Sequence, residues 1–180
     1  MNKQTILKMA TAGVMAVAMM CVPAAIQAQG GSGAGSAADK VLKPADLQKL
    51  LPASVFYRGQ SATTQLRNSG GVKFADGYFV LATLVDTSGY SSSVAAKYQA
   101  YFVTEVPIQV GGQALPAGVY GVGFVEGSKF VVTDVGAHDL LTVTSGEDAG
   151  LKRPMPLQVT TDPAGGFRLY AGRRYVSFTK

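Results

Sequence analysis

The sequence predicts an all-β fold, either an antiparallel sandwich or a small barrel built from short hairpins. From Ser54 onward, apolar residues recur with a period of two, which is the spacing of side chains on one face of a strand. Pairs of turn residues, many of them glycine, separate these runs at short intervals, as in sheets of hairpin-connected strands. No helical pattern alternates with the runs, as an α/β fold would require.

The first 28 residues are predicted to be a cleaved signal peptide. Lys3 and Lys8 precede an apolar run that ends near Val22, and small residues follow as far as Ala28; this three-part pattern is typical of secretory signals. The apolar run is shorter than the roughly 20 residues of a membrane-spanning helix. We therefore expect export to the periplasm or the extracellular space after cleavage behind Ala28, with a retained membrane anchor as the alternative.

Three further features describe the chain after this segment. Cys21 is the only cysteine, and since it leaves with the signal peptide, no disulfide is expected. Residues 29–38 consist of glycine, serine, alanine and one glutamine, which predicts a flexible tether. Residues 39–180 are expected to form a single β-rich domain, and the mature chain is not expected to span a membrane.

One short N-terminal helix is predicted at about residues 44–51. Pro44 suits the first turn of a helix, and Leu47, Leu50 and Leu51 fall on one helical face. Pro52 disfavours the helical conformation at the residue before it and so ends the helix. A helix of this length is marginal alone and needs a sheet to pack against.

The remaining pattern predicts ten to eleven short strands with loops between them. The run 78–85 is apolar on both faces, so we expect a central strand covered on both sides. The segment 87–93 is predicted to be a polar loop. Ten segments carry the strand pattern: 55–57, 72–75, 78–85, 98–106, 119–125, 130–135, 140–144, 157–160, 167–170 and 175–178. The segment 63–66 is a further candidate strand, and the short pieces 108–110 and 113–115 flank the turn at residues 111–112.

Two glycines stand on one face of the predicted strand 119–125. Gly121 and Gly123 alternate with Tyr120, Val122 and Phe124, so a stripe without side chains runs along the face opposite the aromatic residues. Glycine weakens a strand interior and usually marks a bend, a bulge or the close approach of another layer. We expect curvature or close packing here, with a ligand seat as the alternative.

Charge and aromatic content indicate a candidate binding surface near the C-terminus. Of 16 basic residues, Lys3 and Lys8 lie in the signal peptide, which leaves 14 against 11 acids. This excess is too mild for a specific nucleic-acid binder. Arginine stacked on tyrosine can bind an anionic glycan or a lipid surface, whereas the alternative is a solvated face whose arginines pair with nearby acids. The candidate ligand-binding residues are Arg168, Tyr170, Arg173, Arg174 and Tyr175.

The sequence offers few residues for catalysis. His138 is the only histidine, no G-x-S-x-G elbow surrounds a serine, and the ligand spacings of zinc and calcium sites are missing. We therefore expect no metal, no cofactor and no enzymatic activity. The leading hypothesis is an exported domain that binds a small apolar or amphipathic molecule between its sheets, or an envelope component or protein partner on its surface. The alternative is a secreted hydrolase that uses carboxylates or the group Asp134, His138 and Asp139.

Overall fold

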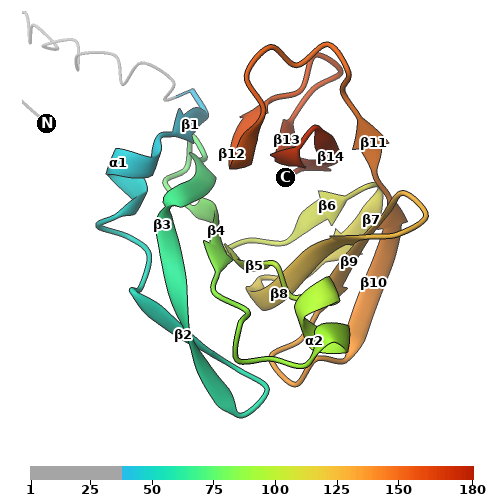
Figure 1. The fold of residues 1–180 in the computed structure, drawn as a ribbon. Coiled ribbons are helices and arrows are strands. Elements are labelled where there is room, and N and C mark those ends of the chain that lie inside the picture. The colour runs from blue at the N-terminus through green and yellow to red at the C-terminus, as the bar shows by residue number, and fades with distance from the viewer. Residues whose placement is uncertain (1–37) are drawn as a thin grey trace, which may run out of the picture. The chain divides into compact units, whose positions relative to one another are not determined.

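The computed structural model describes residues 38–180 (Figure 1). The predicted signal peptide and residues 29–37 of the predicted tether lie outside the described residues. Within residues 38–180 the chain forms fourteen strands and two short helices. The strands pair in an antiparallel manner and make two sheets in a sandwich-like arrangement, so the all-β prediction is confirmed.

The first sheet has eight strands. Along the sheet the order is β1-β3-β4-β5-β8-β9-β10, and β2 pairs with β3 outside this path. The strands are β1 (Lys40–Leu42), β2 (Ser54–Tyr57), β3 (Gln60–Lys73), β4 (Phe79–Val85), β5 (Ala100–Thr104), β8 (Gly118–Val125), β9 (Lys129–Thr133) and β10 (Asp139–Thr144).

The second sheet has six strands, most of them from the C-terminal third of the chain. Its order is β12-β13-β14-β6-β7, and β11 pairs with β14. The β6–β7 hairpin lies in sequence between two strands of the first sheet, β5 and β8, but it belongs to the second sheet because β6 pairs with β14 (Figure 1). The strands are β6 (Ile108–Val110), β7 (Gln113–Leu115), β11 (Gly146–Glu147), β12 (Met155–Thr161), β13 (Phe167–Gly172) and β14 (Arg174–Thr179).

The predicted N-terminal helix is shorter than expected. α1 spans Pro44–Leu47, and the amide groups of Leu50 and Leu51 both donate to the carbonyl of Leu47, at 3.0 and 2.9 Å. The chain therefore ends the helix in a turn, and the prediction of helix up to residue 51 was wrong. Leu50 is 46 % exposed, so it does not share the buried face.

The buried leucines of this segment cover the outer face of β4. Leu47 and Leu51 pack in one cluster with Leu81, while Val80 and Ala82, on the other side of the same strand, belong to the core between the sheets. Strand β4 is therefore covered on both faces, which confirms the expectation for the apolar run 78–85.

A second helix, α2 (Ser92–Lys97), was not predicted. It occupies Ser92 and Ser93, at the end of the segment predicted to be a polar loop, and residues 94–97, which precede the predicted strand 98–106. That strand is reduced to β5, and Tyr98 caps the helix through its amide, which donates to the carbonyl of Val94 at 2.8 Å. Six residues make fewer than two helical turns, so they give no periodic signal.

The segments 63–66 and 72–75, predicted to be separate strands, belong mostly to one long strand, β3. The pairing of β3 with β4 shifts register between Gln65 and Ser69 and then continues through Gly70 and Gly71. A Cβ atom at Gly70 would lie 2.6 Å from the amide nitrogen of Val159 on β12. This glycine therefore allows the second sheet to approach the first.

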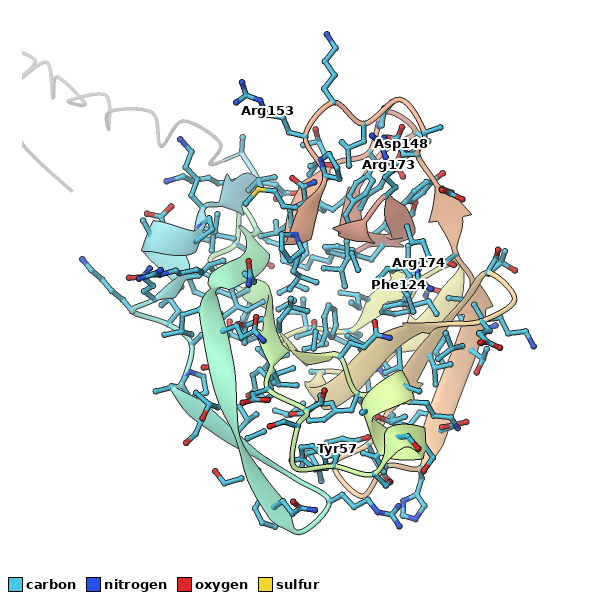
Figure 2. All side chains as sticks on the ribbon, in the orientation of Figure 1. Tyr57, Phe124, Asp148, Arg153, Arg173 and Arg174 are labelled. Carbon is cyan, nitrogen blue, oxygen red and sulfur yellow. The ribbon has the colours of Figure 1, made fainter. Side chains whose placement is uncertain are left out.

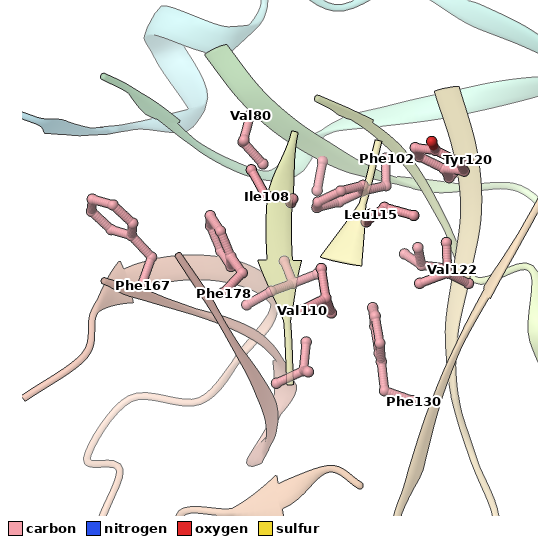
Figure 3. Close-up of a cluster of buried hydrophobic side chains, with 14 of the residues drawn as sticks. Val80, Phe102, Ile108, Val110, Leu115, Tyr120, Val122, Phe130, Phe167 and Phe178 are labelled. Atoms are coloured by element: carbon pink, nitrogen blue, oxygen red, sulfur yellow. The ribbon is translucent and has the colours of Figure 1, made fainter. Parts of the chain in front are cut away.

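The main hydrophobic core fills the space between the two sheets. Figure 3 shows part of this cluster, to which both sheets contribute: Val122 and Phe130 come from the first, Val110 and Phe178 from the second. All four side chains are buried. Removal of this apolar surface from water is the main stabilising contribution to such a fold.

The glycine stripe on β8 faces a second packed layer on the outside of the first sheet. The rings of Tyr57 and Tyr98 stack at 3.6 Å between centroids, and a Cβ atom at Gly121 would lie 2.7 Å from each ring. Gly123 faces the end of α2. The expectation that another layer approaches these glycines closely is confirmed.

Candidate functional site

The five residues predicted to bind a ligand do not share one face of the sheet. Val176 and Phe178 of β14 are buried in the core, and Arg174 lies on their side because alternate residues of a strand point the same way. Arg173 occupies the turn between β13 and β14. The remaining three, on the outer face, are Arg168, Tyr170 and Tyr175.

On the outer face, Arg168 is held by neighbouring side chains. Its Nε lies 2.9 Å from Asp162 Oδ2, and its guanidinium carbon lies 4.2 Å from the centre of the Tyr175 ring. The hydroxyl of Tyr170 donates to Asp148 Oδ2 at 3.1 Å. These internal contacts occupy the groups that a ligand would need.

Asp162 is the buried anion of this network. Burial alone would raise the pKa of its carboxyl, but hydrogen bonds from Arg168, Ser177 and the amide of Ala164 outweigh burial and lower the pKa to about 2. The Ser177 hydroxyl donates at 2.6 Å. Asp162 is therefore ionised at neutral pH and neutralises Arg168.

Arg173 fixes the loop that precedes β12. Its Nη1 donates to the carbonyl oxygens of Ala149 and Leu151 at 2.7 and 2.9 Å, and to that of Asp148 at 3.3 Å. Figure 2 shows Arg173 beside Asp148. This arginine binds backbone carbonyls of its own chain, an arrangement that gives it a structural role.

Arg174 extends in the opposite direction and lies against Phe124 of β8 (Figure 2). Its guanidinium carbon is 5.5 Å from the centre of the Phe124 ring, within the range of a cation–π contact. Its Nη1 also donates to the carbonyl of Val125 at 3.4 Å. Arg174 thus connects the second sheet to the β8–β9 hairpin of the first.

An open groove of about 660 Å³ lies at this contact. Ala96, Phe124 and Val125 give it apolar lining, and three cationic side chains stand around them. Ligand sites usually measure 300–1,000 Å³ and combine apolar walls with a few polar groups. The lining residues are Ser93, Ala96, Lys97, Phe124, Val125, Glu126, Lys129 and Arg174.

The charges around the groove are only partly compensated. Lys97 Nζ lies 2.6 Å from Asp139 Oδ2, whereas Lys129 and Arg174 form no ion pair with any of the described residues. Glu126, the single acid among the lining residues, is also without an ion pair in this part of the chain. Glu147 stands across from Arg174 in the register of β11 and β14, yet no ion pair joins the two. The lining of the groove therefore contains two cations and one acid that form no ion pair with the described residues.

A second, much smaller space lies behind Phe124. It measures about 10 Å³, which is enough for one water at most. It is bounded by Leu84, Gln99, Ala100, Val122, Gly123, Phe124, Leu157, Leu169 and Ala171. In this conformation a small molecule therefore has no room between the sheets at this end.

Asp134, His138 and Asp139 do not form one group in the structure: Asp134 pairs with His138, and Asp139 pairs with Lys97. His138 Nδ1 lies 2.9 Å from Asp134 Oδ2, while Asp139 pairs with Lys97. The amides of Gly136 and His138 also donate to Asp134 Oδ1, and the latter hydrogen bond is the main reason that the pKa of Asp134 is lowered. The imidazole of His138 is 80 % exposed. Among residues 38–180, no three His, Cys, Asp or Glu side chains gather as metal ligands would.

Sequence reasoning identified Arg174 but missed Lys97, Phe124 and Lys129. These residues come from α2, β8 and β9, and no sequence spacing relates them to β14. The one available signal was the face of β8 that carries Tyr120, Val122 and Phe124.

Comparison of the chain with protein-family models, with curated proteins and with solved structures finds no match. No helix between residues 38 and 180 has the length and apolar character needed to cross a membrane.

Proposed function

We propose that this chain is an exported, non-catalytic binding domain and that the groove at Phe124 and Arg174 holds an amphipathic ligand with an anionic group. The observation that carries the proposal is the combination of apolar lining with two unpaired cations, Lys129 and Arg174, at one open groove. The apolar part of the ligand would cover Ala96 and Val125, beside the buried ring of Phe124, and its anionic group would lie between the two cations.

The groove residues favour binding over catalysis. Ser93 Oγ hydrogen-bonds to Ser91 Oγ at 3.1 Å, and Lys97 is engaged by Asp139, so no base activates this hydroxyl. Glu126 lies in a hairpin turn without a second carboxylate among the lining residues, whereas a glycosidase needs a pair. Export is proposed from residues 1–28, and an intact Met1 in the mass spectrum of the mature product would contradict it.

The experiment is a fluorescence titration of residues 29–180 with anilinonaphthalenesulfonate, which has an apolar aromatic body and one anionic group. The double variant Lys129→Ala/Arg174→Ala should bind this probe about tenfold more weakly, because both cations of the groove are removed. Lys152→Ala/Arg153→Ala is the matched control, since it removes two exposed cations from the loop before β12. Equal affinities of the two double variants, or no binding to the unmodified protein at low salt, would overturn the proposal.

A further inference from the structure

A small hollow beside the groove is bordered by three segments: the turn between β2 and β3, helix α2, and the loop between β9 and β10. Its volume is about 190 Å³. Ser93 and Lys97 line both spaces, whereas Lys129 and Arg174 line the groove alone. The residues that line the hollow are Tyr57, Arg58, Ser93, Val94, Lys97 and Ala137.

The turn between β2 and β3 holds an arginine where a different residue type is favoured. Tyr57 and Gln60 pair across the turn, and the two residues between them, Arg58 and Gly59, have positive φ angles of 45° and 80°. These are the features of a two-residue type I′ turn, whose first position is most often asparagine. Few residues other than glycine, asparagine and aspartate adopt a positive φ readily, so the backbone at Arg58 is strained.

The loop between β9 and β10 contributes a second strained residue to the same hollow. Ala137 has a φ angle of 68°, and it is one of only three non-glycine residues with positive φ in the described chain. Two of the three, Arg58 and Ala137, therefore line this one hollow. The two loops are also joined directly, because the amide of Arg58 donates to the carbonyl of Val135 at 2.8 Å. Backbone strain of this kind is concentrated at ligand and active sites.

Arg58 brings to the hollow a positive charge without a counter-charge. The two acids of the neighbouring segment 134–139 are engaged elsewhere, since Asp134 pairs with His138 and Asp139 pairs with Lys97. Arg58 itself forms no ion pair with any of residues 38–180. A guanidinium group presents its donors in a planar fork that matches the two oxygens of a carboxylate. The charge and the geometry of this side chain therefore favour a carboxylate as its partner.

We propose that this hollow is a second binding site, separate from the groove, and that it takes a small organic acid with one carboxylate. The guanidinium of Arg58 binds the carboxylate, and the hydroxyl of Ser93 donates one further hydrogen bond to it. The apolar body of the acid lies on Val94 and Ala137. Sites for larger ligands usually measure 300–1,000 Å³, so a hollow of about 190 Å³ admits only a small body such as one phenyl ring.

The test is a titration of ¹⁵N-labelled residues 29–180 with benzoate, followed by NMR through the shifts of the backbone amides. Benzoate should shift the amides of Gly59, Val94 and Ala137. Benzamide, which has the same ring but no charge, is the ligand control and should bind about tenfold more weakly, because the charge-assisted hydrogen bonds are missing.

The deciding variant is Arg58→Asn, for which two opposite effects are expected. The affinity for benzoate should fall about tenfold, because the guanidinium is lost. The midpoint of urea unfolding should rise, because asparagine suits the type I′ turn better than arginine. Arg58→Lys keeps the charge without the planar fork and should bind benzoate with intermediate affinity. Arg67→Asn, which makes the same substitution at another exposed arginine, is the matched control and should leave the affinity unchanged.

The outcomes separate this inference from the proposed function. A loss of affinity together with a gain of stability in Arg58→Asn would support the site, since an arginine with a purely structural role gives no such combination. An unchanged affinity of this variant, an unfolding midpoint that does not rise, or the absence of shifts at the hollow would each overturn it. Shifts confined to Phe124 and Val125 would place benzoate in the groove, which refutes the second site while the proposed function stands.

Discussion

The carbonyl oxygen of Lys97 packs directly against Gly123, so that a Cβ atom at residue 123 would lie 2.3 Å from it. The carbonyl carbon of Lys97 and the carbonyl oxygen of Ala96 would also be too close, at 2.8 and 3.2 Å. These contacts are with backbone atoms, which cannot rotate away. Because Gly123 has no side chain, the end of α2 packs directly on β8. This contact also places Lys97 at the groove.

Gly123→Ala is expected to destabilise the protein. The methyl group forces the end of α2 away from β8 or distorts the strand, and overpacking of this kind costs about 1–3 kcal/mol. Urea unfolding followed by circular dichroism measures the loss. Gly89→Ala is the control, since its Cβ would meet only the side chain of Gln60, at 3.4 Å. An unchanged unfolding midpoint for Gly123→Ala would show that α2 does not pack on β8 as described.

The lowered pKa of Asp162 predicts how the free energy of unfolding depends on pH. Its folded pKa of about 2 lies below the value near 3.9 of an unfolded aspartate. A carboxyl whose pKa is lowered by folding stabilises the protein above its unfolded pKa, and this stabilisation is lost as the pH falls through the folded pKa. Asp162→Asn should therefore cost about 2–3 kcal/mol at pH 7, and the difference from the unmodified protein should shrink between about pH 4 and pH 2.

Urea unfolding at several pH values measures this difference. Asp76→Asn is the matched control, because Asp76 pairs with Lys180 at an exposed position, where an ion pair contributes little. A constant difference between the unmodified protein and Asp162→Asn from pH 7 to pH 2 would contradict the assignment of Asp162 as a buried anion.

The strands were predictable because burial imposes a period of two. Wherever one face of a strand packs in the core, the apolar residues alternate, as at Val176 and Phe178. The turns between the strands require backbone conformations that glycine adopts readily, which explains the glycine pairs. Gly111 and Gly112 illustrate this requirement, since both have positive φ angles, 54° and 82°. Local chemistry and tertiary packing agree at these positions.

Where the prediction failed, the deciding contact is distant in sequence. Gly70 resembles a strand-breaking residue until Val159 of β12 is seen against it. Leu50 fits a helical face by spacing, yet the chain turns after Leu47 and exposes it. Helix α2 packs its last residues against Gly123 of β8, and no sequence pattern within the helix indicates this contact.

The candidate site was only partly predictable for the same reason. Composition identified a cluster of arginines and tyrosines near the C-terminus, but alternation and turn geometry send Arg168, Arg173 and Arg174 to three different environments. Only Arg174 reaches the groove, because it lies at the start of β14 beside Phe124. The partners Lys97 and Lys129 come from elements that meet β14 only in the folded chain.

A buried hydrogen-bond chain under the glycine stripe allows a quantitative test of side-chain coupling. Thr133 Oγ1 donates to the carbonyl of Gly121 at 3.0 Å, and so it accepts the proton of the Tyr57 hydroxyl, 2.7 Å away. Thr133 is 0 % exposed and Tyr57 is 2 % exposed. Burial, as the largest influence, raises the pKa of Tyr57, which keeps its hydroxyl protonated as the donor.

Thr133→Val should therefore destabilise the protein by about 1–3 kcal/mol, because the Tyr57 hydroxyl and the Gly121 carbonyl are both left buried without this partner. Tyr57→Phe should cost less, since Thr133 keeps its hydrogen bond to Gly121. In the double variant no unsatisfied donor remains at residue 57, so its loss should be about 1 kcal/mol smaller than the sum of the single losses. Urea unfolding of the four proteins measures this coupling, with Thr142→Val on the exposed side of β10 as a control that should be nearly neutral. Additive losses within experimental error would mean that the two hydroxyls do not depend on each other.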